Sequence, residues 1–130
     1  MTFKVTVAEA GKPLSRAKSA ERKPLKVGLV QTKWHADSAE HESVLLEAIR
    51  LAAQNGAEIV FLPELTLSRY MADTRPTGTP NELAEQLDGG PTHLLAAKAA
   101  AENSIYVHIS LYEHEDRADG RGLNCAIIVA

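Results

Sequence analysis

Residues Glu58–Tyr70, EIVFLPELTLSRY, contain the strongest structural signal in this sequence. It opens with a short apolar run, as expected for a buried strand. Pro63 fixes its own φ and pushes Leu62 toward extended geometry, so Glu64 is aimed by a stiff corner at the end of that strand. Ligands of α/β sheets collect beyond the carboxyl ends of strands. Glu64 is therefore the first candidate for a catalytic side chain.

Two interpretations of Glu64 remain open on the residues alone. The neighbouring Leu62, Leu65 and Leu67 favour a partly desolvated carboxylate, which suits a general base. A glutamate after a strand also commonly caps a helix or pairs with a cation. The pattern by itself does not choose between catalysis and a structural role.

The residues before this stretch predict a strand and a helix. LKVGLVQ, from Leu25, is a nearly continuous apolar run. Asp37 and Glu40 resemble a capping box, and the helix should end near Asn55 and Gly56. The predicted apolar face of this helix consists of Val44, Leu45, Ala48, Leu51 and Ala52. A helical crossover of this length favours parallel pairing of the two strands.

The residues after Tyr70 continue the α/β pattern. MADTRPTGTP predicts an irregular loop, and Thr79–Leu87 a brief helix. Another helix is expected from Pro91, and SIYVHISLY alternates as a strand with two different neighbours. LNCAIIVA, from Leu123, predicts a further strand. The sequence therefore predicts an α/β domain whose strands are buried on both faces by packed layers.

Charge separates the first 24 residues from the rest. Residues 1–24 carry six Lys/Arg against two Glu, a net charge of +4, whereas residues 25–130 carry −7. We expect residues 1–24 to form a flexible extension and 25–130 the domain. A basic arm for nucleic acid or anionic lipid is the alternative, and the lack of interleaved aromatic residues disfavours it.

The apolar runs are too short for a membrane helix, and the N-terminus lacks the apolar core of a secretory signal. The single cysteine, Cys125, agrees with a reducing compartment. A cytoplasmic location is therefore expected.

Several segments together resemble the N-terminal half of the carbon–nitrogen hydrolase (nitrilase/amidase) superfamily. The resemblance covers about Lys26 to Ala130, and rests on KVGLVQTKW, NGAEIVFLPELTLSRY, LDGGPTHLLAAKAAAENSIYVHISLYEHED and LNCAIIVA, in that order. Its sharpest element is the LPE corner, where Glu64 aligns with the glutamate of the family's Glu-Lys-Cys triad. LNCAIIVA is similar to the family's Asn-containing strand.

The resemblance implies half of a four-layer α-β-β-α sandwich, and a hydrolase of amide, nitrile or carbamoyl compounds. In such an enzyme a thiolate attacks the carbon, glutamate moves protons and lysine stabilises the developing negative charge. Of these three residues only Glu64 is matched here, so this chain alone is expected to be inactive. The family's chemistry implies no metal or other cofactor. The expected partner is a small-molecule amide or nitrile, with no nucleic acid or membrane, and homo-oligomers are expected of the complete enzyme.

Other reactive side chains do not match the missing triad members. Cys125 falls inside an apolar strand and is interpreted as a small buried hydrophobe. Lys33 and Lys98 are expected to be solvated surface residues. Tyr70, with Arg69, is a weaker candidate for substrate binding, because these residues could equally cap the turn after Glu64.

Three other functions compete with hydrolysis. A metal site is conceivable from two histidines and the nearby acids, namely His108, His114, Glu113, Glu115 and Asp116, but a strand-end histidine beside a charged turn is usually solvated. A non-catalytic interaction module could retain half of the hydrolase fold, because half of the sandwich that the resemblance implies would leave a sheet face and edges uncovered, and such surfaces favour pairing. A nucleotide binder is disfavoured, because VQTKWHAD replaces any glycine-rich loop after the first strand.

Overall fold

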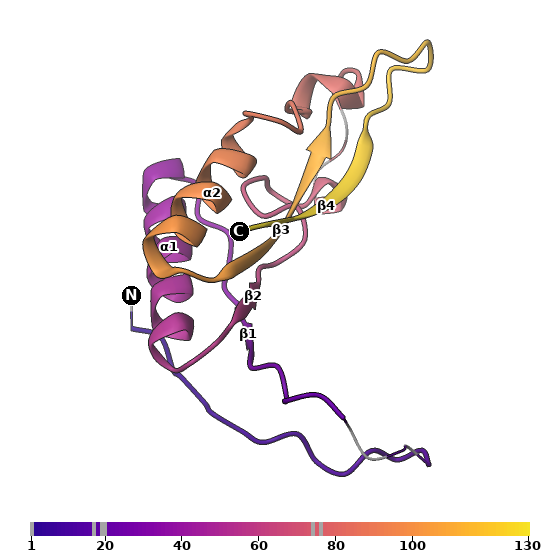
Figure 1. Ribbon diagram of the computed structural model, residues 1–130. Coiled ribbons are helices and arrows are strands. Elements are labelled where there is room, and N and C mark those ends of the chain that lie inside the picture. The colour runs from indigo at the N-terminus through magenta and orange to yellow at the C-terminus, as the bar shows by residue number, and fades with distance from the viewer. Residues whose placement is uncertain (1, 17, 19–20, 74, 76) are drawn as a thin grey trace.

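The computed structural model describes residues 2–16, 18, 21–73, 75 and 77–130 (Figure 1). Its elements, in chain order, are β1 (Val27–Leu29), α1 (Ser38–Gln54), β2 (Ile59–Phe61), the 3₁₀ helices η1 (Met71–Asp73) and η2 (Pro80–Leu83), α2 (Pro91–Asn103), β3 (Tyr106–Glu113) and β4 (Leu123–Val129). The described residues before β1 form no helix or strand (Figure 1).

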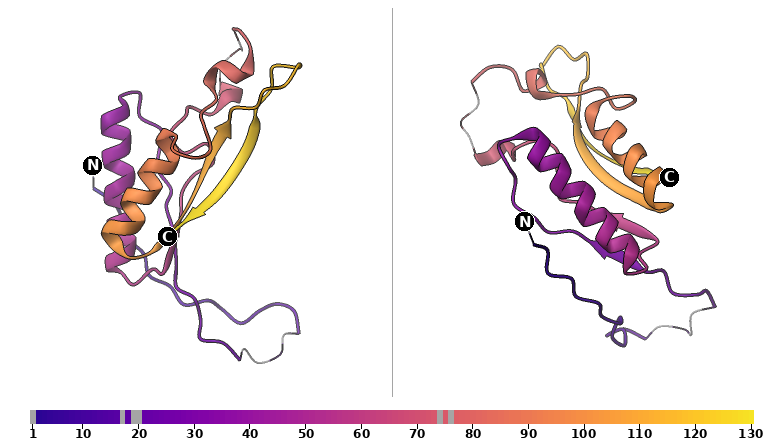
Figure 2. Two further views of the ribbon diagram at one scale, coloured as in Figure 1. Left: turned by 45° about the horizontal axis from the view of Figure 1, so that its top comes forward. Right: turned by 90° about the vertical axis from the view of Figure 1, so that its left-hand side faces the viewer.

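The strands form one sheet in the order β1-β2-β3-β4. β1, β2 and β3 are parallel, and β4 is antiparallel to β3. The predicted parallel pairing across the first helical crossover is therefore confirmed. Both α-helices lie on the same side of the sheet (Figures 1 and 2). The predicted α/β fold class is confirmed.

Helix α1 begins and packs largely as its sequence indicates. The Asp37 side chain accepts a 2.7 Å hydrogen bond from the backbone N–H of Glu40, as an N-cap carboxylate does. Leu45 and Ala48, from the predicted apolar face, are buried. Ile49, which was not assigned to that face, is also buried and belongs to the same core cluster. Leu51 and Ala52, which the pattern also placed on that face, are only half-buried. The buried stripe therefore lies nearer the start of the helix than the sequence pattern indicated.

The core lies between the helices and the sheet. It joins residues of α1 and α2 to β2 and β3, namely Leu45, Ile49, Val60, Leu62, Leu95, Ala96, Ala99, Ala100, Val107 and Ile109. Gly28 of β1 faces α1 across this layer, and a Cβ there would lie 2.9 Å from the Cβ of Ala52. The absence of a side chain at residue 28 therefore allows α1 to approach β1 closely.

The prediction that the strands are buried on both faces is wrong for this chain. Side chains alternate across a strand, so Val27, Leu29, Tyr106 and Ile128 project from the face opposite the helices. Leu29 is 80% exposed and Ile128 is 59% exposed. We call the surface formed by these four exposed side chains the bare face. Ser110 and Tyr112, on the same side of the sheet farther along β3, are buried.

The brief helix predicted over Thr79–Leu87 is shorter than expected. The 3₁₀ helix η2 ends at Leu83 because the chain then joins the end of β3. Glu85 N–H donates to the Tyr112 carbonyl at 2.9 Å, and the Glu85 carbonyl accepts from His114 N–H at 2.8 Å. These long-range bonds take the backbone groups that another helical turn would have used.

A helix that crosses a membrane needs about 20 predominantly apolar residues. Among the described residues, no helix is both long enough and apolar enough to cross a bilayer.

Candidate active site

Glu64 lies just after β2, where the chain turns sharply. Leu62 and Leu65 are buried in the interior, whereas the Glu64 side chain is exposed. The predicted partial desolvation of this carboxylate is therefore wrong for the chain as it stands, because the flanking leucines turn away from the acid. Leu65 follows with φ of +50°, in the left-handed region that leucine seldom adopts. The backbone therefore turns sharply over Pro63–Leu65, the segment that carries Glu64 and that we call the corner.

The exposed carboxylate borders a hollow on the sheet. The hollow has a volume of about 320 Å³ and is lined by Leu62, Glu64, His108, Ser110, Asn124, Cys125 and Ala126. These residues come from the end of β2, the middle of β3 and the start of β4. Glu64 is therefore at the rim of a concavity, at the carboxyl end of a parallel strand, where α/β sheets commonly bind ligands.

Asn124 holds the Glu64 side chain in place. Its Nδ2 donates a 2.7 Å hydrogen bond to Oε1 of Glu64. The bond orients one carboxylate oxygen toward β4. The Asn-containing strand was recognised in the sequence, but this contact was not, because nothing local joins two residues so far apart in the chain.

Cys125 contributes to the lining but is not placed as a nucleophile. It pairs in register with Leu111, so its side chain leaves β4 on the opposite face from Asn124. The thiol donates a 3.0 Å hydrogen bond to Oε2 of Glu113. This bond, with desolvation and the nearby negative charge, raises the pKa of Cys125 to about 11. The group is half-buried and hydrogen-bonded, rather than the buried hydrophobe that the sequence predicted.

His108 is a lining residue that the sequence did not single out as part of this site. Its ring stacks on Phe61 with centroids 4.6 Å apart. Its Nδ1 is buried and has no hydrogen-bond partner among the described residues. The alternation of β3 places it on the same side of the sheet as the bare face, but which strand-end residues share a hollow depends on the strand order.

The other residues considered for a metal site are separated from the hollow. His114 Nε2 accepts a hydrogen bond from Nδ2 of Asn81 at 3.1 Å, near η2. Within the described part of the chain, no group of three or more His, Cys, Asp or Glu residues is arranged to hold a metal ion.

Tyr70 and the lysines do not reach the hollow. Tyr70 is 51% exposed, and its carbonyl accepts a hydrogen bond from the N–H of Asp73, the last residue of η1. Arg69 Nε lies 3.7 Å from the Asp73 carboxylate. Lys33 and Lys98 are exposed, as expected. A role for Tyr70 in substrate binding stays a prediction.

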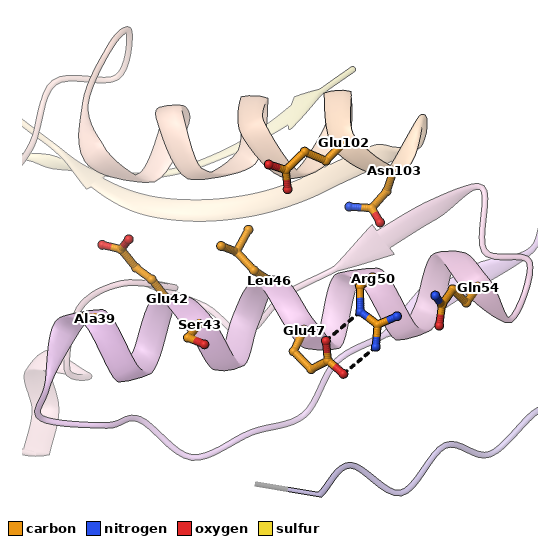
Figure 3. Close-up of a pocket in the computed structure, with 9 residues that line it drawn as sticks. All are labelled: Ala39, Glu42, Ser43, Leu46, Glu47, Arg50, Gln54, Glu102 and Asn103. Atoms are coloured by element: carbon orange, nitrogen blue, oxygen red, sulfur yellow. Dashed lines mark hydrogen bonds and ion pairs between the residues drawn. The ribbon is translucent and has the colours of Figure 1, made fainter.

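A larger hollow lies on the helix layer, between α1 and α2 (Figure 3). It measures about 710 Å³ and includes Glu42, Leu46, Glu47, Arg50 and Glu102. Arg50 and Glu47 form a two-bond ion pair along its wall (Figure 3). Neither Glu64 nor Asn124 borders it, so its size does not make it the better candidate for hydrolytic chemistry.

Comparison with known proteins identifies the family. The sequence profile described as carbon-nitrogen hydrolase matches residues 26–130. No curated protein matches the chain in sequence. A solved mutant amidase of the nitrilase superfamily from Nesterenkonia AN1 is 18% identical with a TM-score of 0.50, covering 79% of this chain and 42% of the amidase.

A second solved structure also resembles this chain in its fold. It is a CN-hydrolase superfamily protein from Xanthomonas campestris with an arsenic adduct in its active site, 24% identical with a TM-score of 0.50. The match covers 77% of this chain and 39% of that protein. The chain thus spans about two fifths of the length of these structures and shares their partial fold. It belongs to the carbon-nitrogen hydrolase family.

Proposed function

We propose that this chain is the N-terminal part of a hydrolase of non-peptide carbon–nitrogen bonds, in which Glu64 transfers protons. One observation carries the proposal: Asn124 holds the Glu64 carboxylate at the rim of a hollow beyond a parallel strand. Family membership supplies the reaction class, and the resemblance at the LPE corner supplies the role of the acid. The substrates are small-molecule amides, nitriles or carbamoyl compounds.

The proposed role suits the geometry of the carboxylate. Asn124 occupies Oε1, so Oε2 is the oxygen available to the reacting groups. For an amide, Glu64 takes the proton of the attacking thiol and delivers it to the departing amine as the C–N bond breaks. It then takes a proton from water, which attacks the thioester and releases the acid and the thiol.

The nucleophile and the cation of this reaction are proposed to come from sequence beyond residue 130. Cys125 is a poor substitute, because its raised pKa keeps it in the unreactive thiol form at neutral pH. Lys33 and Lys98 are outside the hollow. We therefore propose that residues 1–130 alone are inactive, and that the complete enzyme forms homo-oligomers.

Incubation of the purified 130-residue chain with simple amides and nitriles tests this proposal. We expect no release of ammonia above the buffer rate. Turnover that Glu64→Gln abolishes would show that the chain already contains a working nucleophile, and the proposed division of the triad would be wrong. The coding sequence downstream of codon 130, inspected in all frames for a Lys and a Cys motif, supplies independent evidence.

The bare face favours a second candidate function, a non-catalytic interaction module that retains half of the hydrolase fold. Leu29 and Ile128 expose large apolar side chains there, and such a surface favours association. Sedimentation velocity distinguishes the two candidates. Stable self-association that Leu29→Lys removes would support the module, whereas a well-behaved monomer would argue against it.

A further inference from the structure

We propose that Thr66 and Ser110 are positioning residues, whose hydroxyl groups fix the backbone on both sides of Glu64. The inference rests on the proposed function, because it concerns how the acid of that reaction is held. Neither residue was singled out by the sequence, and both are buried.

The two hydroxyl groups engage the two peptide groups that adjoin the Glu64 Cα. Thr66 Oγ1 donates a 2.8 Å hydrogen bond to the Pro63 carbonyl, which belongs to the peptide before Glu64. Leu65 N–H, which belongs to the peptide after Glu64, donates to Ser110 Oγ at 3.0 Å. Both φ and ψ of the acid are thereby restrained.

The hydroxyl groups are themselves held by β3. Ser110 N–H donates to Thr66 Oγ1 at 3.2 Å, and Thr66 N–H donates to the Ser110 carbonyl at 2.9 Å. Thr66 and Ser110 therefore form a reciprocal pair that joins the corner to the neighbouring strand. Because the hydroxyl bonds replace water at buried groups, removing one leaves an unsatisfied polar group.

A third buried side chain anchors the corner to α1. His41 Nε2 lies 2.8 Å from the Thr66 carbonyl. Since a carbonyl only accepts, this nitrogen carries the proton and donates. The corner is thus tied to β3 on one side and to the first turns of α1 on the other.

The conformation at Leu65 explains why such restraints are needed. Its φ of +50° is unfavourable for a side chain that has a Cβ, and it persists only where surrounding contacts enforce it. The bond from Leu65 N–H to Ser110 Oγ is one such contact. A general base must lie within hydrogen-bond reach of its proton, so relaxation of this turn would displace Glu64 from its productive position.

The test uses the 130-residue chain and NMR spectroscopy. Thr66→Val removes the hydroxyl at nearly constant volume, Ser110→Ala removes the other, and Thr66→Ser restores a hydroxyl. Thr92→Val is the matched control, because Thr92 is fully buried and its hydroxyl bonds instead to Glu85. The measured quantities are the exchange rate of the Leu65 amide and the side-chain amide resonances of Asn124.

We expect Thr66→Val and Ser110→Ala to accelerate Leu65 amide exchange by about tenfold or more relative to core amides. The Asn124 side-chain resonances should shift toward those of Glu64→Ala, in which the contact to the acid is lost. Thr66→Ser should recover the wild-type spectrum, and Thr92→Val should leave both local readouts unchanged.

Unchanged exchange and resonances in folded Thr66→Val and Ser110→Ala would overturn the inference. Global unfolding of both variants would also contradict it, because the hydroxyl groups would then support the whole fold rather than the corner. The experiment uses no substrate, so its failure is distinct from failure of the proposed hydrolase, which is measured by turnover.

Discussion

Asn124 Nδ2 donates a 2.7 Å hydrogen bond to Oε1 of Glu64, a residue 60 positions earlier in the chain. The bond spans β3, because Asn124 lies on β4 and Glu64 follows β2. It therefore exists only when the sheet is assembled in the observed order. This contact fixes the orientation of the Glu64 carboxylate at the end of β2.

Asn124→Ala should free the Glu64 side chain without unfolding the chain. Both groups are exposed, so we expect a loss of less than about 1 kcal/mol in the free energy of unfolding. The order parameter of the Glu64 side-chain methylenes, measured by ¹³C relaxation, should fall. Asn103→Ala is the control, because that amide bonds the Ala99 carbonyl within α2. An unchanged order parameter in Asn124→Ala would show that the bond does not orient the acid.

Cys125 should react slowly with alkylating reagents in the folded chain. Its pKa is raised to about 11, mainly by the hydrogen bond to Glu113, so little thiolate is present at neutral pH. Glu113→Gln should increase the iodoacetamide rate at about pH 8 by roughly tenfold or more. Glu115→Gln, which removes a weaker influence on the same thiol, should have a smaller effect. Fast alkylation of the wild-type protein would show that the thiol pKa is not raised.

The raised pKa of Cys125 makes the stability of the folded chain depend on pH. The folded chain favours the neutral thiol, so its contribution is present below the ordinary pKa of 9.0 and is lost as pH rises through about 11. The difference in unfolding free energy between wild type and Cys125→Ser should therefore shrink over this alkaline interval, as followed by urea titration. A difference that stays constant across it would argue against the raised pKa.

Gly28→Ala should weaken the contact between α1 and β1. The added methyl group would lie 2.9 Å from the Ala52 Cβ, so the helix must shift. We expect a loss of about 1–3 kcal/mol in unfolding free energy, as for overpacked cores. Gly11→Ala is the matched control, since nothing lies within 4 Å of a Cβ there. Equal stability of the two variants would mean that helix and strand are not in close contact at Gly28.

Leu45→Ala should be far more harmful than Leu94→Ala. Leu45 is 0% exposed in the core, whereas Leu94 is 59% exposed on α2. The buried truncation should cost about 2–5 kcal/mol and the exposed one under about 1 kcal/mol. Urea denaturation followed by circular dichroism measures both. If Leu94→Ala lowered the unfolding free energy more than Leu45→Ala, the side of α1 that carries Leu45 would not be the side packed on the sheet.

The features that local physics determines were predictable from the sequence. Asp37 caps α1 because its carboxylate stands three residues before Glu40, whose backbone N–H has no partner within the helix. Helix α2 starts at Pro91 because proline suits the first helical position and two glycines precede it. The parallel order of β1 and β2 follows from the helix between them. These signals involve neighbouring residues and do not depend on the rest of the chain.

The features that the sequence did not predict depend on distant partners. η2 ends early because Glu85 pairs with the end of β3. Glu64 was placed at a strand end, but its contact to Asn124 and the hydrogen-bonded pair of Thr66 and Ser110 require the strand order.

The bare face separates what periodicity predicts from what the resemblance implies. Periodicity alone did not predict it, because an apolar run looks the same whether its second layer belongs to the same chain or not. The resemblance to half of a sandwich implied an uncovered sheet face, and the exposure of Leu29 and Ile128 agrees with it.

The most direct test is the activity of a polypeptide that continues beyond residue 130 through the Lys and Cys motifs of the family. Glu64→Gln should lower kcat/KM for its amide or nitrile substrate by about 10²-fold or more, because the base that moves the thiol proton is lost. Glu102→Gln, an exposed glutamate on α2, is the control and should leave kcat/KM unchanged. Wild-type kcat/KM in a folded Glu64→Gln enzyme would show that this acid does not carry the proton transfer.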